Sequence, residues 1–181
     1  MKKMLMALVA AAAIMFTTSS SFAQGAVVPY ENMVSILSAY HGLPEPEYWS
    51  RLDVNHTREM LTKMVDDQKL HTIVRARAML ALQYFRTDDT VNLIAGKAKG
   101  DSIAYMRSTA YEALVNSEGE KALKLVGEGL KDSDTMVRMS AIRSLKKIGG
   151  PEAKSMLEGN LKEESNPAVK SVMQRSLDQM K

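Results

Sequence analysis

The segment from Asp134 to Pro151 decides the fold, and it reads DTMVRMSAIRSLKKIGGP. Its apolar and small residues fall three or four apart, as on one face of an amphipathic helix, and Gly149-Gly150-Pro151 ends that helix and begins another. The core of the pattern is Val137-Arg138, then Ala141, then Leu145. Further copies stand at steps of 32, 31 and 32 residues: Val74-Arg75-Ala78-Leu82, Met106-Arg107-Ala110-Leu114 and Val169-Lys170-Met173-Leu177. Such a period indicates one supersecondary unit stacked on copies of itself.

Each unit is predicted to hold two helices, which makes the chain an all-α solenoid of about four helix pairs. We expect first helices near 56–66, 89–98, 120–131 and 151–162, and second helices near 72–85, 104–116, 135–147 and 167–179. Residues 24–54 are predicted to form a leader and a capping helix, with Asn55 as the N-cap of the next helix. The repeat domain is then 55–181, divided at about 55–86, 87–117, 118–149 and 150–181. Gly96, Gly127 and Gly159 each stand ten residues before the Val or Met of the last three motifs, so we expect first and second helices to approach closely there, whereas the first unit has Met64 at this place.

An acidic residue stands six positions before the basic residue of each of the last three motifs. An acid in the turn, then Val-Arg, then Ala and Leu, resembles the HEAT repeat over about 55–181, and more narrowly the short HEAT-like units of the phycobilisome-lyase type. The first unit departs from it, with Lys69 in place of the acid. The resemblance implies a right-handed superhelix of antiparallel helix pairs, in which acids and bases of successive turns form a structural ladder. Here the ladder would comprise Arg75, Asp101, Arg107, Asp132, Arg138, Glu164 and Lys170.

The first 23 residues are predicted to be a secretory signal peptide. Lys2 and Lys3 precede an apolar run from Met4 to Phe16, and Ser21-Phe22-Ala23 offers small residues for cleavage after Ala23. The run is too short for a good membrane span. We therefore expect an exported protein, periplasmic or else secreted, without stable membrane insertion after cleavage. Export also argues against the bilin-handling activity of the cytoplasmic lyases.

Composition excludes several classes of function. Losing Lys2 and Lys3 leaves 22 basic against 21 acidic residues, so the basic precursor gives no reason to expect a nucleic-acid partner. The chain has no cysteine, which rules out disulfides and thiol catalysis. The histidines, His41, His56 and His71, fall on separate predicted elements and carry no metal-binding motif. We find no catalytic motif and expect neither a metal nor a cofactor, and no enzymatic activity.

HEAT repeats as a family are scaffolds and protein-binding surfaces, so a protein partner is expected. The second helices should line the concave side of the stack. Positions 3, 6 and 10 after each Val or Met should point outward there, together with Met139. This face changes from apolar to basic along the stack, which fits a protein segment with an acidic end. The predicted partner-binding residues are Arg77, Leu80, Tyr84, Thr109, Glu112, Met139, Ser140, Arg143, Lys147 and Arg175.

Other interpretations stay open. The same side chains also fit a solvated helix face. Tyr48 and Trp49 fit a cap that seals the first unit, or an aromatic docking site. A small-ligand binder or envelope enzyme would use the groove or the Trp49 loop and would need a deep pocket. A structural subunit would instead display a large continuous apolar patch.

Overall fold

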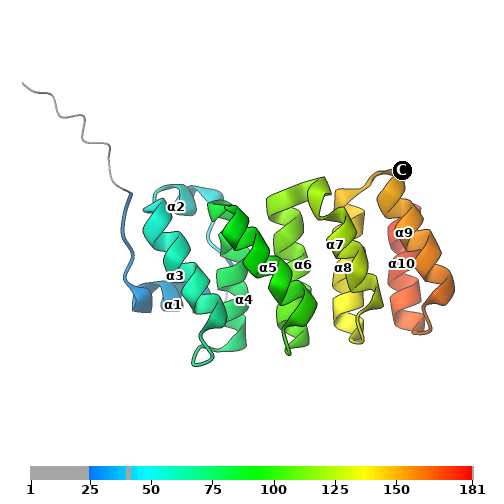
Figure 1. Ribbon diagram of the computed structural model, residues 1–181, viewed down its shortest axis with the longest axis horizontal. Helices are drawn as coiled ribbons and strands as arrows, with labels where there is room; N and C mark the ends of the chain where they lie inside the picture. Colours follow the sequence, from blue (N-terminus) through cyan, green and yellow to red (C-terminus); the bar gives the residue numbers. More distant parts are fainter. Residues whose placement is uncertain (1–24, 40–41, 181) are drawn as a thin grey trace, which may run out of the picture.

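The chain forms an elongated stack of helix pairs in two layers (Figure 1). The computed structural model describes residues 25–39 and 42–180, so the predicted signal peptide and His41 lie outside the described residues. The first helices of the units make one layer, and the second helices make the other. The all-α repeat architecture is therefore confirmed. The elements are α1 (Tyr30–Ser38), α2 (Pro46–Ser50), α3 (Val54–Asp66), α4 (Thr72–Ala81), η1 (Leu82–Phe85), α5 (Asp88–Gly100), α6 (Ala104–Glu118), η2 (Gly119–Ala122), α7 (Leu123–Glu128), η3 (Gly129–Lys131), α8 (Thr135–Ile148), α9 (Gly150–Glu163) and α10 (Pro167–Gln179).

Short polar side chains begin most helices of the repeats. Thr87 and Thr90 form a reciprocal capping box at α5, and Asp134 and Asn166 accept hydrogen bonds from the first turns of α8 and α10. The prediction of Asn55 as an N-cap was wrong. Asp53 has that role, because its carboxylate accepts from the His56 backbone N–H and starts α3 two residues earlier.

The repeated apolar positions form one continuous core between the two layers. Val74, Met106, Val137 and Val169 are all buried, and so are the Ala or Met and the Leu that follow them in each motif. These residues lie on one stripe of each second helix because their spacing matches the helical period. Burial of this stripe against the neighbouring units holds the stack together, since the chain has no cysteine with which to form a disulfide.

The predicted close approach at the recurring glycines was largely wrong. A Cβ placed on Gly96 or Gly159 would meet nothing within 4 Å, and one on Gly127 would face the Met156 sulfur of the next first helix. The close approach to second helices occurs at Gly129 instead. A Cβ there would lie 2.8 Å from the Tyr111 ring and 2.9 Å from the Ala141 Cβ. The third first helix is accordingly broken into η2, α7 and η3 around these glycines.

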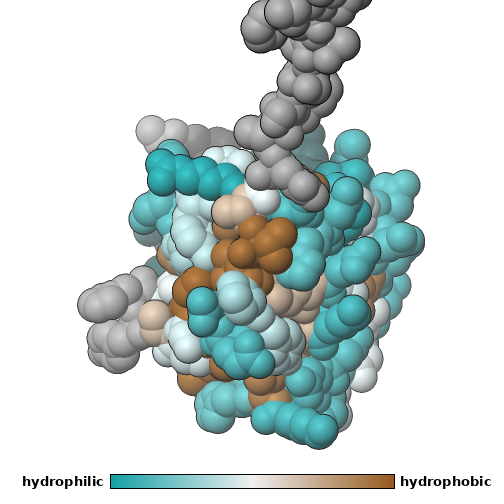
Figure 2. Space-filling model, turned by 90° about the vertical axis from the view of Figure 1, so that its left-hand side faces the viewer, coloured by the Kyte–Doolittle hydropathy of each residue, from teal (hydrophilic) through white to brown (hydrophobic). Residues whose placement is uncertain are grey.

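The N-terminal end of the stack is closed by aromatic packing. Trp49 is 1% exposed and stacks on Tyr84, with ring centroids 5.7 Å apart, while its indole N–H donates to the Pro44 carbonyl at 3.0 Å. An isolated parallel bridge between Ala26 and Leu52 ties the preceding segment to this end. Figure 2 shows an apolar patch on the same end, where Val27 and Val54 are 58% and 55% exposed. None of the described helices has the length and apolarity that a membrane span requires.

Candidate functional site

Ion pairs link successive units along one edge of the stack. Arg107 of α6 donates to both carboxylate oxygens of Asp132, at 2.8 Å each, and Arg138 of α8 donates to both oxygens of Glu164 at 2.7 and 3.1 Å. The hydrogen bond from each arginine lowers the pKa of its partner carboxyl. Each arginine therefore bonds the carboxylate of the unit that follows it.

Each acid also organises its own unit. The Asp132 backbone carbonyl accepts from Arg138 at 2.8 Å, and its carboxylate accepts from the Asp134 N–H at 2.8 Å. Asp101 repeats this arrangement, with its carbonyl bonded to Arg107 at 2.9 Å and its carboxylate to the Ile103 N–H. The six-residue spacing thus places the acid at a turn where it touches two arginines.

The ladder changes at its two ends. Arg75, in the unit that carries Lys69 in place of the acid, is buried but stands 4.0 Å from Asp101, which also pairs with Lys97. It donates to the Val65 carbonyl and to the Gln68 side chain. Lys170, which we expected on the ladder, is exposed and forms no ion pair among the described residues. Within residues 42–180 no further unit follows to supply its carboxylate.

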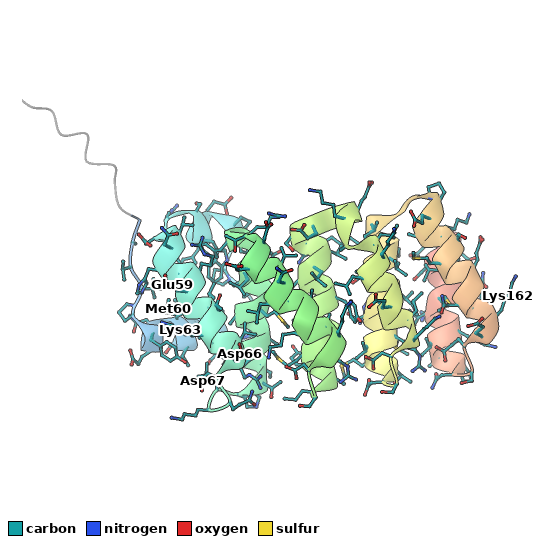
Figure 3. The ribbon with its side chains drawn as sticks, viewed as in Figure 1. Glu59, Met60, Lys63, Asp66, Asp67 and Lys162 are labelled. Atoms are coloured by element: carbon teal, nitrogen blue, oxygen red, sulfur yellow. The ribbon has the colours of Figure 1, made fainter. Side chains whose placement is uncertain are left out.

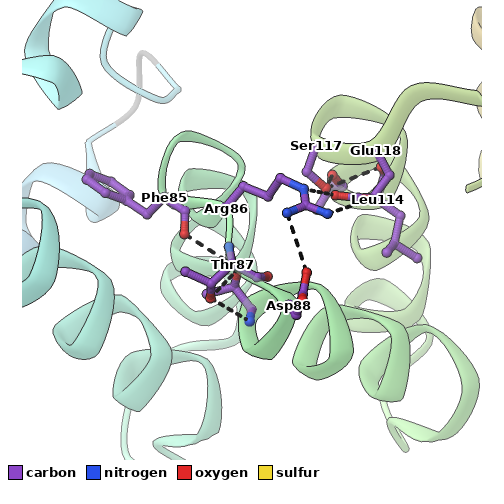
Figure 4. A network of polar contacts seen from close by, with 9 residues as sticks. Phe85, Arg86, Thr87, Asp88, Leu114, Ser117 and Glu118 are labelled. Atoms are coloured by element: carbon purple, nitrogen blue, oxygen red, sulfur yellow. Dashed lines mark hydrogen bonds and ion pairs between the residues drawn. The ribbon is translucent and has the colours of Figure 1, made fainter. Parts of the chain in front are cut away.

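A second clamp joins units at the opposite ends of the helices (Figure 4). Arg86, in the turn before α5, donates to both carboxylate oxygens of Glu118 at the end of α6, and it also lies 3.5 Å from Asp88. This hydrogen bond with Glu118 raises the pKa of Arg86. Arg86 therefore ties the end of the first repeat to the end of α6.

Four of the predicted partner-binding residues meet in one hollow between α6 and α8. The hollow has a volume of about 190 Å³, and Ser140 and Ser144 contribute to its lining from α8. Glu112 and Arg143, at equivalent positions of neighbouring parallel helices, are exposed beside it. Lys147 donates across it to the Asn116 side chain. The full lining is Glu112, Val115, Asn116, Ser140, Arg143, Ser144 and Lys147.

We expected the residues three positions after the Val or Met of each motif to point freely outward, but they do not. Ser140 is buried and donates to the Ser108 carbonyl of α6 at 2.8 Å, and Thr109 is buried with its hydroxyl on the Tyr105 carbonyl. Arg77 donates to the carbonyls of Leu37 and Ala39 at the end of α1. This position faces the neighbouring element of the stack, so its side chains serve packing and capping.

The remaining predicted residues are spread along the second-helix layer. Leu80 is half-buried, and Tyr84 is exposed on one face while its other face stacks on Trp49. Met139 is half-buried against the core and is not on an open face as predicted. Arg175 of α10 is exposed, and its Nε donates to the Ser171 carbonyl of its own helix. Sequence reasoning missed Ser144, although a small residue recurs at its position in every unit as Ala81, Ala113 and Ser176.

Larger hollows lie on the first-helix layer and at the N-terminal end. One of about 410 Å³ lies between α3 and the start of α5, and one of about 340 Å³ lies between α3 and residues 27–30. Glu59 and Lys63 border both from α3 (Figure 3). Three polar residues of the larger hollow already have partners, since Thr87 and Thr90 bond one another and Arg58 donates to Asn55. Size alone therefore does not select these hollows as the site.

Comparison with known proteins supports the repeat assignment. Residues 104–178, which span α6 to α10, match the family described as HEAT repeats. No curated protein matches the chain. HEAT repeats are protein-interaction scaffolds in general. Among the described residues, no group of three or more His, Asp and Glu side chains is placed to hold a metal ion.

Proposed function

We propose that this chain is an exported protein-interaction module that binds its partner through the second-helix layer. The observation that carries the proposal is the α6–α8 hollow, which gathers Glu112, Ser140, Arg143 and Lys147 on the layer that we predicted as the binding face. Small side chains in its lining let a ligand approach the helix backbones, while long charged side chains beside it provide specific contacts. Tyr and Arg are the residues that most often dominate binding energy at interfaces, which makes Tyr84 and Arg143 the preferred anchors.

We propose binding and not catalysis as its role. A hollow of about 190 Å³ is small beside typical ligand pockets of roughly 300–1,000 Å³. A shallow polar hollow on an extended face is better suited to a side chain of a partner protein.

Export rests on the sequence of residues 1–23. The positive start, the apolar run from Met4 to Phe16 and the cleavage signal at Ser21-Phe22-Ala23 support a periplasmic or secreted protein. Cell fractionation and N-terminal sequencing test this directly. We expect the mature chain in the periplasmic fraction with Gln24 first. A full-length chain in the cytoplasm would contradict export.

Affinity capture from an envelope extract tests the binding face. The bait is the purified protein, compared with an Arg143→Glu variant and with a Lys162→Glu control on α9 of the other layer (Figure 3). Both positions are exposed, so both variants should fold normally. We expect one partner to be captured by the native protein and the control, and lost by Arg143→Glu. A partner lost only with Lys162→Glu would place the site on the first-helix layer.

A further inference from the structure

The C-terminal half of the second-helix layer carries positive charge that the described chain does not neutralise. Helix α8 contains no Asp or Glu, and among the described residues no ion pair involves its Arg143, Lys146 or Lys147, or Arg175 of α10. Unpaired lysines also occur on α9, as Lys154 and Lys162, but there they share the helix with Glu152, Glu158 and Glu163. Helices α8 and α10 together hold six basic residues and one acidic residue, Asp178, so positive charge is in excess on this surface.

The hydrogen bonds of Lys146 and Lys147 do not neutralise that positive charge. Lys147 donates to Asn116 of α6 and Lys146 to Gln179 of α10, and both acceptors are neutral amide oxygens. The negative end of the α8 dipole accounts for lysines in the last turn. It does not account for Arg143, which lies before the last turn and has no hydrogen-bond partner among the described side chains.

Ser144 adds a hydroxyl group to the lining of the hollow. Its side chain is only 5% exposed and borders the hollow, yet its hydroxyl has no hydrogen-bond partner within residues 42–180. Several helical serines donate to a carbonyl of their own helix, as Ser117 does to Ala113 and Ser176 to Val172. Solvent reaches the Ser144 oxygen, because the buried side-chain oxygen that lacks a partner among the described residues is that of Thr57. The Ser144 oxygen is therefore available to a group that enters the hollow.

We propose that a carboxylate from an acidic peptide segment of the partner protein binds in the α6–α8 hollow. Arg143 and Lys147 neutralise it, and the Ser144 hydroxyl donates to it; charge-assisted hydrogen bonds of this kind are the stronger ones. This inference rests on the proposed function, because it assumes that the partner lies on the second-helix layer. It adds the chemistry of the partner and the residues that recognise it.

Glu112 gives the segment a direction. It stands on the α6 side of the hollow and repels a further acid there, so additional acidic residues extend toward α10, over Lys146 and Arg175. The other end of the segment passes over Leu80 and Tyr84, where apolar residues fit. An extended chain of about nine residues covers this span, because neighbouring helices pack roughly 10 Å apart and each residue adds about 3.3 Å.

A selection from random peptides of about nine to twelve residues tests the proposal without a known partner, since that length covers the span. The immobilised bait is the purified protein. We expect the enriched peptides to carry Asp or Glu toward one end and apolar residues toward the other. Enrichment of neutral or basic peptides, or no enrichment, would overturn the proposal.

Variants then locate the binding of a selected acidic peptide, measured by fluorescence anisotropy. Arg143→Glu should weaken binding by about tenfold or more, as for a central charged contact. Lys162→Glu is the matched control and should leave affinity unchanged.

Glu112→Gln should strengthen binding about twofold to fivefold by removing a like charge. A poorly folded variant cannot bind more tightly than the native protein, so a gain in affinity by Glu112→Gln tests the site even if Arg143→Glu folds poorly. Equal loss in Arg143→Glu and Lys162→Glu would show only diffuse attraction and would overturn the site.

Backbone amide shifts on titration separate failure of this inference from failure of the proposed function. Shifts at α6 and α8 with a peptide that lacks acidic residues would keep the second-helix layer and reject the carboxylate. Shifts confined to α3, α5 or α9 would reject both. The two conclusions together predict shifts centred on residues 140–147, with an acidic peptide and not with its Asn/Gln counterpart.

Discussion

Arg107 and Asp132 form a bidentate pair, with Nε and Nη2 each 2.8 Å from one carboxylate oxygen, although 25 residues separate them. The pair joins the second helix of one unit to the turn of the next. Both side chains are 13% exposed, so water does little to screen the interaction. The Asp132 carboxylate also accepts a hydrogen bond from the Asp134 N–H. Asp132 therefore fixes both the turn in its own repeat and the spacing to the repeat before it.

Removal of one member of this pair should destabilise the protein strongly. We expect Arg107→Ala to reduce the free energy of unfolding by about 3 kcal/mol, because Asp132 is left mostly buried without its cation. Arg107→Lys should recover only part of the loss, since an ammonium cannot bond both oxygens in the planar geometry. Urea unfolding followed by circular dichroism measures both variants. A loss equal to that of an exposed variant such as Lys170→Ala would contradict the role of the ladder.

Acid should weaken the fold through the ladder carboxyls. Their pKa values in the folded state lie below the usual 3.8 for Asp132 and 4.5 for Glu164, mainly because of the hydrogen bonds from Arg107 and Arg138. Their contribution is complete above those usual values and is lost as the pH falls through the lowered ones. Unfolding measured from about pH 7 to about pH 3 should show this loss, and Asp132→Asn should reduce it. An unchanged pH dependence in that variant would exclude Asp132 as a source.

Alkaline pH should destabilise the fold through ionisation of Tyr111. Burial raises its pKa from 10.0 to about 12. The unfolded chain loses this proton first, so the stability contributed by Tyr111 is complete below pH 10 and is lost as the pH rises toward 12. Burial also raises the pKa of Tyr30 and Tyr48, but Tyr111 should be the last tyrosine to ionise in an ultraviolet titration of phenolate absorption, and Tyr111→Phe should remove that last step. Persistence of the late step in that variant would assign it to another tyrosine.

Two glycines provide a matched test of packing. Gly129→Ala should destabilise by about 1–3 kcal/mol, because the added methyl meets the Tyr111 ring and Ala141 at distances below 3 Å. Gly159→Ala lies in α9 with open space around it and should stabilise by roughly 0.5–1 kcal/mol through helix propensity. Thermal unfolding compares the two. Effects of the same sign would show that the close approach at Gly129 is not what sets the outcome.

The sequence predicted the repeat architecture well because the recurring Val-Arg-Ala-Leu pattern reports a helical face and its period together. The second helices begin at Thr72, Ala104, Thr135 and Pro167, at or next to the expected starts. Finer features depended on three-dimensional packing. The burial of Ser140 and Thr109 depends on how closely parallel helices approach, and the break of the third first helix depends on contacts at Gly129. The place of Ser144 in the lining of the hollow likewise depends on how α6 and α8 pack.

The central claim is that a partner protein lies on the second-helix layer at the α6–α8 hollow. Site-specific photo-crosslinking in the producing cell tests it most directly, with the photoreactive residue placed at Glu112, Asn116 or Arg143, and at Lys124 or Lys162 of the first-helix layer as controls. The account predicts a discrete crosslinked product, containing one other protein, from the hollow positions and not from the controls. A product that forms from Lys124 or Lys162, with none from the hollow positions, would contradict it.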